Sequence, residues 1–292
     1  MSLITGIQEY CTKDGPGIRT TVFFKGCSLK CGWCHNPEAI HFSNEIAYYS
    51  RKCIRCGKCR QVCPQHLLSE GPGVPGSLCS LCGLCVKHCP TGALRLVAQE
   101  YSVETLCSRI LADRVFFEVS GGGVTFSGGE PLLQDDLPAI LKTMHNNGIH
   151  TAVETALNVP LERLKIIIDK VDLFLVDIKM VDTELHRFYT GVDTNTIHSN
   201  IRYLTQTESK ICFRTPVIPG VNDNVKAMNE IEEFITSLPH FERYNIELIP
   251  FHNYCVPKYE SLGLKYQFAS CDNLTERDLE SLKKQFKTIK VY

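Results

Sequence analysis

Sixteen cysteines in a chain of 292 residues constrain this protein more than any other feature, because eleven of them fall into three closely spaced runs. Such clustering is typical of metal binding rather than of a disulfide-stabilised secreted scaffold. Eight of the eleven lie between about residues 51 and 90, together with two Cys-Pro pairs and a Gly/Pro-rich stretch at 71–76. This segment shows little apolar periodicity, so we expect metal rather than a hydrophobic core to hold it together.

Two of the runs repeat the spacing Cys-x2-Cys-x2-Cys-x3-Cys-Pro, which is the bacterial ferredoxin pattern for [4Fe–4S] clusters. In that pattern, three thiolates of one run bind one cluster and the fourth cysteine crosses to the other cluster. We therefore predict one cluster bound by Cys53, Cys56, Cys59 and Cys89, and a second bound by Cys63, Cys79, Cys82 and Cys85. Zinc also binds four cysteines in Cys-x2-Cys patterns and is the alternative, but the duplicated pattern favours iron–sulfur clusters.

The composition is that of an ordinary folded protein, with 43% hydrophobic and 22% charged residues. The net charge of −1 gives no general attraction to nucleic acid or to an anionic membrane. No stretch approaches the roughly 20 apolar residues of a membrane span, and residues 1–17 lack the apolar core of a secretory signal. We therefore expect a cytoplasmic protein that binds neither nucleic acid nor a membrane.

Outside the cysteine-rich segment, β-rich runs alternate with helical patterns, which indicates an α/β fold with a parallel sheet. The expected strands are 18–25, 123–126, 150–155, 171–177, 211–218 and 243–250, and the expected helices are 103–114, 136–147, 161–170, 182–189, 197–208, 225–238 and 276–288. The continuous apolar run Leu173-Phe174-Leu175-Val176 is typical of a parallel strand covered on both faces. Periodicity leaves open whether the sheet is doubly wound or forms a partial barrel.

The third run, Cys27-x3-Cys31-x2-Cys34, follows directly after the expected strand 18–25. The carboxyl ends of parallel strands are where α/β folds place their ligand sites. Three thiolates leave one iron of a [4Fe–4S] cluster without a protein ligand. Because an open coordination position distinguishes a catalytic metal centre from a structural one, as it does for zinc, we predict that Cys27, Cys31 and Cys34 hold a catalytic cluster.

This run, with Trp33 just before its last cysteine, resembles the radical S-adenosylmethionine (radical SAM) superfamily. The neighbouring stretches are similar to those of the activating enzymes of glycyl radical enzymes, of which pyruvate formate-lyase activating enzyme is the best known. They are Asp14-Gly-Pro-Gly-Ile-Arg-Thr20, Phe23-Phe-Lys-Gly-Cys27, Cys34-His-Asn-Pro-Glu38, Ser127-Gly-Gly-Glu-Pro131, Asp177-Ile-Lys179 and Pro250-Phe-His252. With its eight-cysteine insert, the chain resembles the longer members of that family.

The resemblance implies a partial (β/α)6 barrel made of residues 1–48 and 93–292, with a ferredoxin-like insert of two [4Fe–4S] clusters at 49–92. It also implies a third [4Fe–4S] cluster, at Cys27, Cys31 and Cys34, and S-adenosyl-L-methionine (SAM), whose amine and carboxylate bind the open iron. One electron then cleaves SAM to methionine and a 5′-deoxyadenosyl radical, which removes a hydrogen from a glycine of the partner. A flavodoxin or a ferredoxin is the implied electron donor.

The resemblance further implies which residues contact SAM: Trp33, Cys34, His35, Gly129, Asp177, Ile178, Lys179 and His252. Each has a structural alternative, such as core packing for Trp33, an ordinary turn for Gly129, a helix cap for Asp177 and a satisfied structural role for His252. A monovalent cation between Glu154 and Asp177 is also implied. Arg214 is expected to contact the SAM carboxylate or a partner peptide, or to pair with a structural acid.

The resulting interpretation is a radical SAM oxidoreductase that installs a glycyl radical on a partner enzyme under anaerobic conditions. We favour a partner like pyruvate formate-lyase (formate C-acetyltransferase), because that is the family's commonest label. The alternatives are an activase of a diol dehydratase or an arylacetate decarboxylase, a radical SAM enzyme acting on a small molecule, and a ferredoxin-type carrier fused to a passive α/β scaffold. We expect the partner to release a glycine-bearing loop into the barrel, where Asp14 and Arg19 clamp it.

Overall fold

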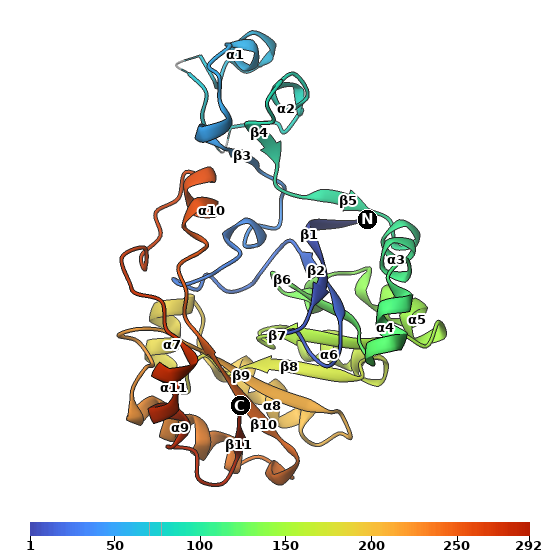
Figure 1. Ribbon diagram of the computed structural model, residues 1–292, viewed down its shortest axis with the longest axis vertical. Helices are drawn as coiled ribbons and strands as arrows, with labels where there is room; N and C mark the ends of the chain where they lie inside the picture. Colours follow the sequence, from blue (N-terminus) through green and yellow to red (C-terminus); the bar gives the residue numbers. More distant parts are fainter. Residues whose placement is uncertain (70, 77) are drawn as a thin grey trace.

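The computed structural model describes residues 1–69, 71–76 and 78–292, and it is built around a nine-stranded sheet (Figure 1). The order of this sheet is β11-β10-β9-β8-β7-β6-β2-β1-β5, and β3 and β4 form a separate two-stranded sheet. The strands are β1 (Ser2–Cys11), β2 (Arg19–Phe24), β3 (Ile46–Tyr48), β4 (Leu94–Leu96), β5 (Gln99–Tyr101), β6 (Gly123–Gly128), β7 (His150–Thr155), β8 (Leu173–Asp177), β9 (Ile211–Val217), β10 (Asn245–Pro250) and β11 (Lys290–Val291).

Six consecutive strands of this sheet, β2 and β6 to β10, pair parallel to one another. They are the six strands expected from the sequence, and their ends differ from the expected ends by at most two residues. Four of them supply Phe24, Phe126, Phe174 and Phe213, all fully buried, because a parallel strand is covered on both faces. Burial on both faces therefore explains why these strands could be found from apolar runs.

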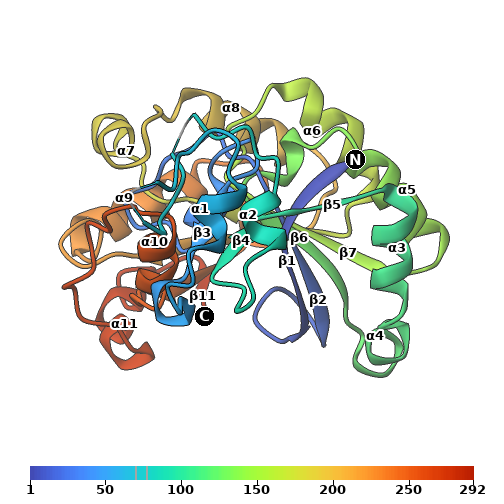
Figure 2. The ribbon, with the colours of Figure 1, turned by 90° about the horizontal axis from the view of Figure 1, so that it is seen from above.

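Helices surround the outer side of this curved sheet, which is not closed because its end strands β11 and β5 are not neighbours (Figure 2). The architecture is thus a partial α/β barrel rather than a doubly wound sheet. The helices are α1 (Lys58–Val62), α2 (Leu84–Lys87), α3 (Val103–Leu111), α4 (Arg114–Ser120), α5 (Leu137–Asn146), α6 (Leu161–Ile167), α7 (Thr183–Thr190), α8 (Asn195–Leu204), α9 (Val225–Thr236), α10 (Val256–Ser261) and α11 (Glu276–Lys283). Among the described residues, every helix is too short or too polar to cross a bilayer.

The N-terminal strand β1 was not expected from the sequence. It pairs antiparallel with β2, and its register steps from Ile4↔Phe24 to Gly6↔Phe23 and from Gln8↔Thr21 to Cys11↔Arg19. Each step leaves one extra residue in β1, so the strand contains two β-bulges. Polar residues and these bulges interrupt the alternation of apolar and polar residues that a regular strand would show. The sequence pattern therefore did not predict β1.

Residues 49–92 lie at one end of the molecule, above the ribbon of β3 and β4 in Figure 1. Among the described residues, the buried apolar cluster in and beneath this segment consists of only Ile46, Leu68, Cys85 and Leu94. The barrel core contains about ten times as many buried side chains, from nearly every strand and helix around the sheet. The boundaries 1–48, 49–92 and 93–292 remain a prediction, and the small cluster includes Ile46 and Leu94 from outside 49–92.

Candidate functional site

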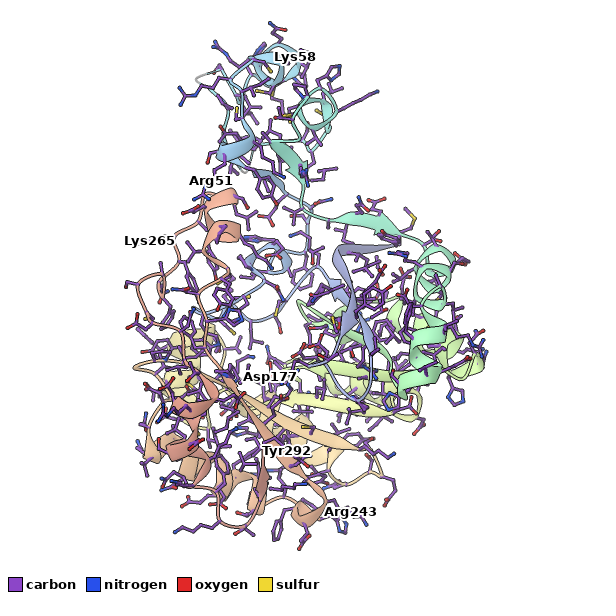
Figure 3. The ribbon with its side chains drawn as sticks, viewed as in Figure 1. Arg51, Lys58, Asp177, Arg243, Lys265 and Tyr292 are labelled. Atoms are coloured by element: carbon purple, nitrogen blue, oxygen red, sulfur yellow. The ribbon has the colours of Figure 1, made fainter. Side chains whose placement is uncertain are left out.

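The three-cysteine run lies in a cavity of about 300 Å³ at the carboxyl ends of the parallel strands. The cavity brings together residues that are far apart in the sequence, including Cys27, Cys31, Trp33, Cys34, His35, Gly129, Glu130, Glu154, Asp177, Lys179 and Arg214. In Figure 3, Asp177 marks its position near the middle of the barrel. Of the SAM-contact residues expected from the sequence, only Ile178 and His252 do not line this cavity.

The three thiols of this run are suited to a metal cluster. Burial raises the pKa of Cys27 to about 12 and also raises the pKa values of Cys31 and Cys34. Buried thiols of this kind ionise when a metal compensates their charge. Leu29 N donates a hydrogen bond of 3.4 Å to Cys27 Sγ, a contact of the type that tunes iron–sulfur clusters.

Two lysines hold the segment that follows Cys34. Lys25, fully buried, donates to Glu38 O at 2.6 Å and to Glu45 Oε2 at 2.7 Å. Lys258 of α10 donates to three oxygens of the same segment, His35 O at 3.1 Å, Asn36 Oδ1 at 2.9 Å and Glu38 Oε1 at 2.6 Å.

Tyr259, the next residue of α10, donates its hydroxyl to Cys34 O at 3.0 Å. Helix α10 therefore fixes the backbone beside the third cysteine through two side chains. Sequence reasoning missed Lys258 and Tyr259, because no local pattern connects α10 with a loop more than 200 residues away.

Gly129 lies directly after β6. Glycine is required here because the backbone packs closely against other parts of the protein, not because of a ligand. A Cβ at this position would lie 2.2 Å from Gly26 O and 2.7 Å from Ala39 O, so only glycine fits beside the cluster loop. The Gly129 N–H donates to Phe24 O at 2.8 Å, which leaves its carbonyl as the backbone group available to a ligand ammonium. The glycine is therefore both a packing requirement and a wall of the cavity.

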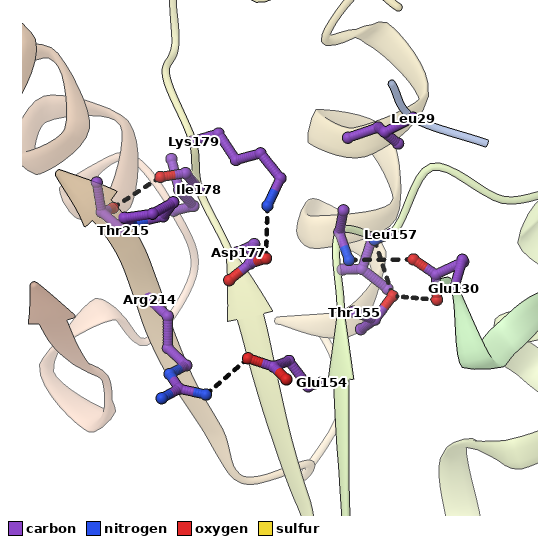
Figure 4. Close-up of polar contacts among 12 residues, drawn as sticks. Leu29, Glu130, Glu154, Thr155, Leu157, Asp177, Ile178, Lys179, Arg214 and Thr215 are labelled. Carbon is purple, nitrogen blue, oxygen red and sulfur yellow. Dashed lines mark hydrogen bonds and ion pairs between the residues drawn. The ribbon is translucent and has the colours of Figure 1, made fainter. Parts of the chain in front are cut away.

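Asp177 is the last residue of β8, and Lys179 lies two residues after it. Their side chains form an ion pair of 2.6 Å inside the cavity (Figure 4). Burial alone lowers the pKa of Lys179, but the charges of Asp177 and Cys31 outweigh it and hold the pKa above its usual range. The cap of the following helix α7 is Asp182, so Asp177 is not a helix cap. Ile178 between them points into the barrel core, where it is 2% exposed, so its side chain does not reach the cavity as expected.

Glu154 at the end of β7 already has a positive partner. Its Oε1 accepts from Arg214 Nη1 at 2.7 Å (Figure 4), and its Oε2 accepts from the Ser127 hydroxyl. Arg214 is 5% exposed and also faces Glu247, whose Oε2 lies 3.1 Å from Nε. Arg214 therefore pairs with acids of the barrel, and the expected cation at Glu154 would have to share that carboxylate with a guanidinium.

Glu130 is a second buried acid of the cavity, and no individual role was predicted for it. Its carboxylate accepts from Thr155 Oγ1 at 2.8 Å, Ala156 N at 3.1 Å and Leu132 N at 3.2 Å. Burial raises its pKa to about 7, although these hydrogen bonds favour the ionised form. The contacts tie the ends of β6 and β7 together below the cluster loop (Figure 4).

Trp33 and the two histidines occupy different parts of the site. Trp33 is 4% exposed and packs against Tyr189 and Phe268, so most of its ring belongs to a small core beside the cavity. His35 lines the cavity and stacks on His252 with ring centroids 4.1 Å apart. His35 Nε2 and His252 Nδ1 are buried without a hydrogen-bond partner among the described residues, which fits a polar ligand at this position.

The expected clamp of Asp14 and Arg19 is wrong for Arg19. This arginine is fully buried, and its guanidinium donates to Thr125 Oγ1 and Val124 O, both at 2.6 Å. A side chain enclosed between strands cannot bind a peptide. Asp14 lines the cavity and accepts from Thr21 Oγ1 at 2.5 Å. Of the two residues, only Asp14 therefore remains a candidate for contacting a partner peptide.

The insert brings Cys53, Cys56, Cys59 and Cys89 to the wall of one small cavity, which is the set expected for one cluster. Near Cys85, burial and then the charges of Cys79, Cys63 and Cys82 raise the pKa of the thiol, so these four also lie together. Both runs repeat one backbone shape, with φ of +54° and +55° at Arg55 and Leu81. In both, the N–H of that residue donates to the sulfur of the first cysteine at 3.4 Å.

All sixteen cysteines lie in the described part of the chain and are free of disulfides there. Within the same residues, no three His, Cys, Asp or Glu side chains converge as they would on a single metal ion.

Known proteins similar to this chain agree with this geometry. The profile described as "Radical SAM superfamily" matches residues 84–232, and that of a "4Fe-4S single cluster domain" matches residues 13–62. The chain is 35% identical to the trans-4-hydroxy-L-proline dehydratase activating enzyme of Clostridioides difficile, over 97% of this chain and 95% of that protein. It is 39% identical to the isethionate sulfite-lyase activating enzyme of Desulfovibrio desulfuricans, over 89% and 86% of the two chains.

Among solved structures, a radical SAM methyltransferase from Sphaerobacter thermophilus has a TM-score of 0.56 at 13% identity, covering 100% of this chain and 77% of that chain. At this identity the likeness is one of fold.

Proposed function

Because this chain belongs to the radical SAM superfamily and, within it, to the activating enzymes of glycyl radical enzymes, we propose that the cavity of Cys27, Cys31 and Cys34 binds the cluster and SAM with which it activates a partner. The observation that carries the proposal is that this one cavity joins three thiols to charged side chains from β7, β8 and β9 and from the residues just after β8. When bound, the [4Fe–4S] cluster and SAM supply a one-electron cleavage that yields a hydrogen-abstracting radical.

The chain's own residues bind and orient these groups. The three thiolates hold the cluster, and Lys258 and Tyr259 fix the backbone beside Cys34. Lys179 places a cation between the thiols and Asp177, which suits a site that carries several negative charges. The carbonyl of Gly129 and the unpartnered nitrogens of His35 and His252 are available to polar groups of SAM.

The insert is proposed to hold two further [4Fe–4S] clusters that pass electrons toward the barrel. Support comes from the two four-cysteine sets and from the exposure of Cys56 and Cys82, which would place each cluster near the surface where a flavodoxin or ferredoxin could dock. About twelve irons per chain would follow from three clusters.

The partner is proposed to be a glycyl radical enzyme, attacked at a glycine in a released loop. A pyruvate formate-lyase-like partner remains a prediction from the sequence. The names of the two relatives add a hydroxyproline dehydratase and an isethionate sulfite-lyase as candidates.

An anaerobic assay with these three candidate partners tests the proposal. The reconstituted protein should form 5′-deoxyadenosine and a glycyl radical detectable by electron paramagnetic resonance (EPR) on at least one partner. Cys27→Ala should abolish both products, whereas Cys107→Ala, which changes a buried cysteine outside the three runs, should retain them. SAM cleavage that depends on a small molecule and never on a protein would favour the small-molecule alternative, and failure to bind SAM would favour the electron carrier.

A further inference from the structure

The outer edge of β1 is largely unpaired. On one side β1 pairs with β2 along most of its length, but on the other side β5 covers only Ser2, Leu3 and Ile4. Beyond Ile4, among the described residues, no strand pairs with residues 5–10 on this side, and no backbone hydrogen bond from a turn or loop reaches them. About 20 Å of strand edge is therefore free, at about 3.4 Å per residue.

Ile7 presents its backbone to this free side. The Phe24 carbonyl accepts from Gly129 N on the β6 side, so by alternation Phe23 faces β1. Phe23 is the register partner of Gly6, so Gly6 faces β2 and Ile7 turns its N–H and C=O outward. Gly6 has no Cβ, and a Cβ there would meet nothing closer than 3.8 Å, so packing inside the protein does not demand glycine. A glycine within a strand often marks a place where another backbone approaches closely.

Two cavities follow this free edge, of about 500 Å³ and about 530 Å³. The first is lined by Ile4, Thr5, Gly6 and Ile7, and the second by Gln8 and then Tyr10 to Asp14. Side chains of a strand alternate between its two faces, so a cavity over one face would collect every second residue. The run of consecutive residues, together with the unpaired edge, indicates that this space follows the backbone edge of β1.

The opposite wall of this space comes from the region that follows β10. Lys258 lines both cavities, so together they form one groove between β1 and the β10–α10 region. Tyr254, 73% exposed, stands on this wall and stacks on His252 at 4.6 Å. At its inner end the groove shares Asp14, His35 and Asn36 with the cavity of the three cysteines. The groove therefore leads from solvent to the reaction site.

We propose that the partner's glycine-bearing segment binds in this groove as an extended strand that pairs with the free edge of β1. The inference rests on the proposed function, because it takes a polypeptide glycine as the substrate. An unpaired strand edge recognises backbone rather than particular side chains, and strand addition is an established mode of peptide binding. Pairing along β1 brings the backbone of the segment, including a glycine Cα, to the Asp14–His35 end, where the groove meets the cysteine cavity.

Hydrogen–deuterium exchange of the iron-loaded protein tests this pairing. The probe is a capped heptapeptide, Ac-Thr-Val-Thr-Gly-Thr-Val-Thr-NH2, at millimolar concentration. Fragments covering residues 5–10 should exchange more slowly with the probe, while fragments of α9 should be unchanged. Absence of protection in residues 5–10, whether the peptide binds elsewhere or not at all, overturns the proposal.

Backbone-methylated probes sharpen the test. N-methylation at every second residue should weaken binding about fivefold per amide that faces β1, the effect of about one lost hydrogen bond, whereas N-methylation at the intervening residues should change affinity little. Equal effects at all positions would show that the segment does not bind as a strand.

A variant of β1 gives an independent measurement. Ile7→Pro removes the outward N–H at a position where an edge strand tolerates proline, and Ile7→Val keeps it. The proline variant should bind the probe about fivefold more weakly than the valine variant. If Ile7→Pro does not fold, Tyr254→Ala replaces it, with Phe188→Ala on α7 as the exposed aromatic control. If the two variants of the pair that is used bind the probe with equal affinity, the peptide does not bind in this groove.

The two proposals fail separately. Activation of a partner without protection of residues 5–10 would refute strand pairing and leave the proposed function intact. Protection by the probe without activation of any candidate partner would leave a peptide groove whose substrate is another polypeptide.

Discussion

The cysteine loop of the barrel and the cysteine runs of the insert hold their thiols in opposite surroundings. Cys27, Cys31 and Cys34 line a cavity walled by five strand ends, and burial raises the pKa of each thiol. In the insert, Cys56 and Cys82 are exposed, and the apolar cluster beneath them contains four buried side chains. The barrel thus builds its site on an existing core, whereas the insert has little other than its thiols to organise it.

This difference separates what metal does in the two regions. In the barrel, Lys25, Lys258 and Tyr259 hold Cys34 and the segment that follows it, so protein contacts help to shape the site. In the insert, helices α1 and α2 have four to five residues each and cannot stand alone. We therefore expect metal to be catalytic in one region and structural, as well as electron-carrying, in the other.

The largest effect is expected from removing the ligands of the barrel cluster. The variant with Cys27, Cys31 and Cys34 all changed to Ala should lose SAM cleavage completely and should retain about eight irons, those of two clusters. Formation of 5′-deoxyadenosine by this variant would refute the catalytic assignment. Iron analysis and chromatography of the products measure both outcomes.

Removing all iron should affect the two regions unequally. After anaerobic chelation, residues 49–92 should become the first site of limited proteolysis, because their folding depends on metal, while the barrel fragments stay protected. Mass spectrometry of the early fragments identifies the cut sites. First cuts within the barrel would show that the barrel, and not only the insert, depends on metal for its folding.

Damage confined to the insert should leave part of the chemistry. The variant Cys56→Ala/Cys82→Ala should lose iron from the insert but still cleave SAM when a strong chemical reductant replaces the protein donor. Complete loss of SAM binding in this variant would mean that the insert shapes the barrel site. Cys212→Ala, outside the three runs, is the matched control.

A smaller effect is expected where α10 meets the cluster loop. Tyr259→Phe removes the hydroxyl that donates to Cys34 O and should lower the free energy of unfolding by about 1 kcal/mol. It should also alter the EPR signal of the barrel cluster and leave those of the insert unchanged. Tyr203→Phe is the control, because the Tyr203 hydroxyl makes no side-chain hydrogen bond among the described residues.

The smallest effect concerns pH and lies entirely within the barrel. Burial, with the charge of Arg202, lowers the pKa of His198 to about 4, and its ring packs on Phe234 at 4.3 Å. Between pH 6.5 and 4, His198 is protonated in the unfolded chain but not in the folded chain. Its contribution to the free energy of unfolding is therefore fully present above pH 6.5 and falls as the pH drops toward 4. His198→Gln should flatten the melting temperature over this range. An unchanged slope would assign the pH dependence to other groups.

Sequence reasoning found the parallel strands because they are buried on both faces, and it found the cysteines because their spacing is a chemical signature. It placed Ile178 and Arg19 at ligand surfaces, whereas the structure buries both, since family motifs do not say which side chains point inward. It also missed β1, β5, β11, α4 and α10. These elements are short, polar or at an edge, and they are defined by tertiary contacts rather than by their own periodicity.

The same limit applies to the site. Lys258 and Tyr259 act on a loop that is distant in the sequence, and Glu130 was visible only as part of a motif. The spacing of the cysteines predicted which thiols come together, because the ferredoxin pattern includes the exchange of the fourth cysteine between the two runs. Partners from different strands required the folded chain.

The free edge of β1 also carries a risk of self-association. An exposed strand edge can pair with the same edge of another copy, which is a route to aggregation that natural sheets suppress. The two bulges of β1 restrict this route, because they leave only Gly6, Ile7 and Gln8 in regular register between them. A rigid, straight edge would find no regular partner along this strand. A flexible segment could follow the bulges and pair with β1. The bulges that limit pairing with another copy of the protein would therefore favour a flexible peptide over a rigid strand.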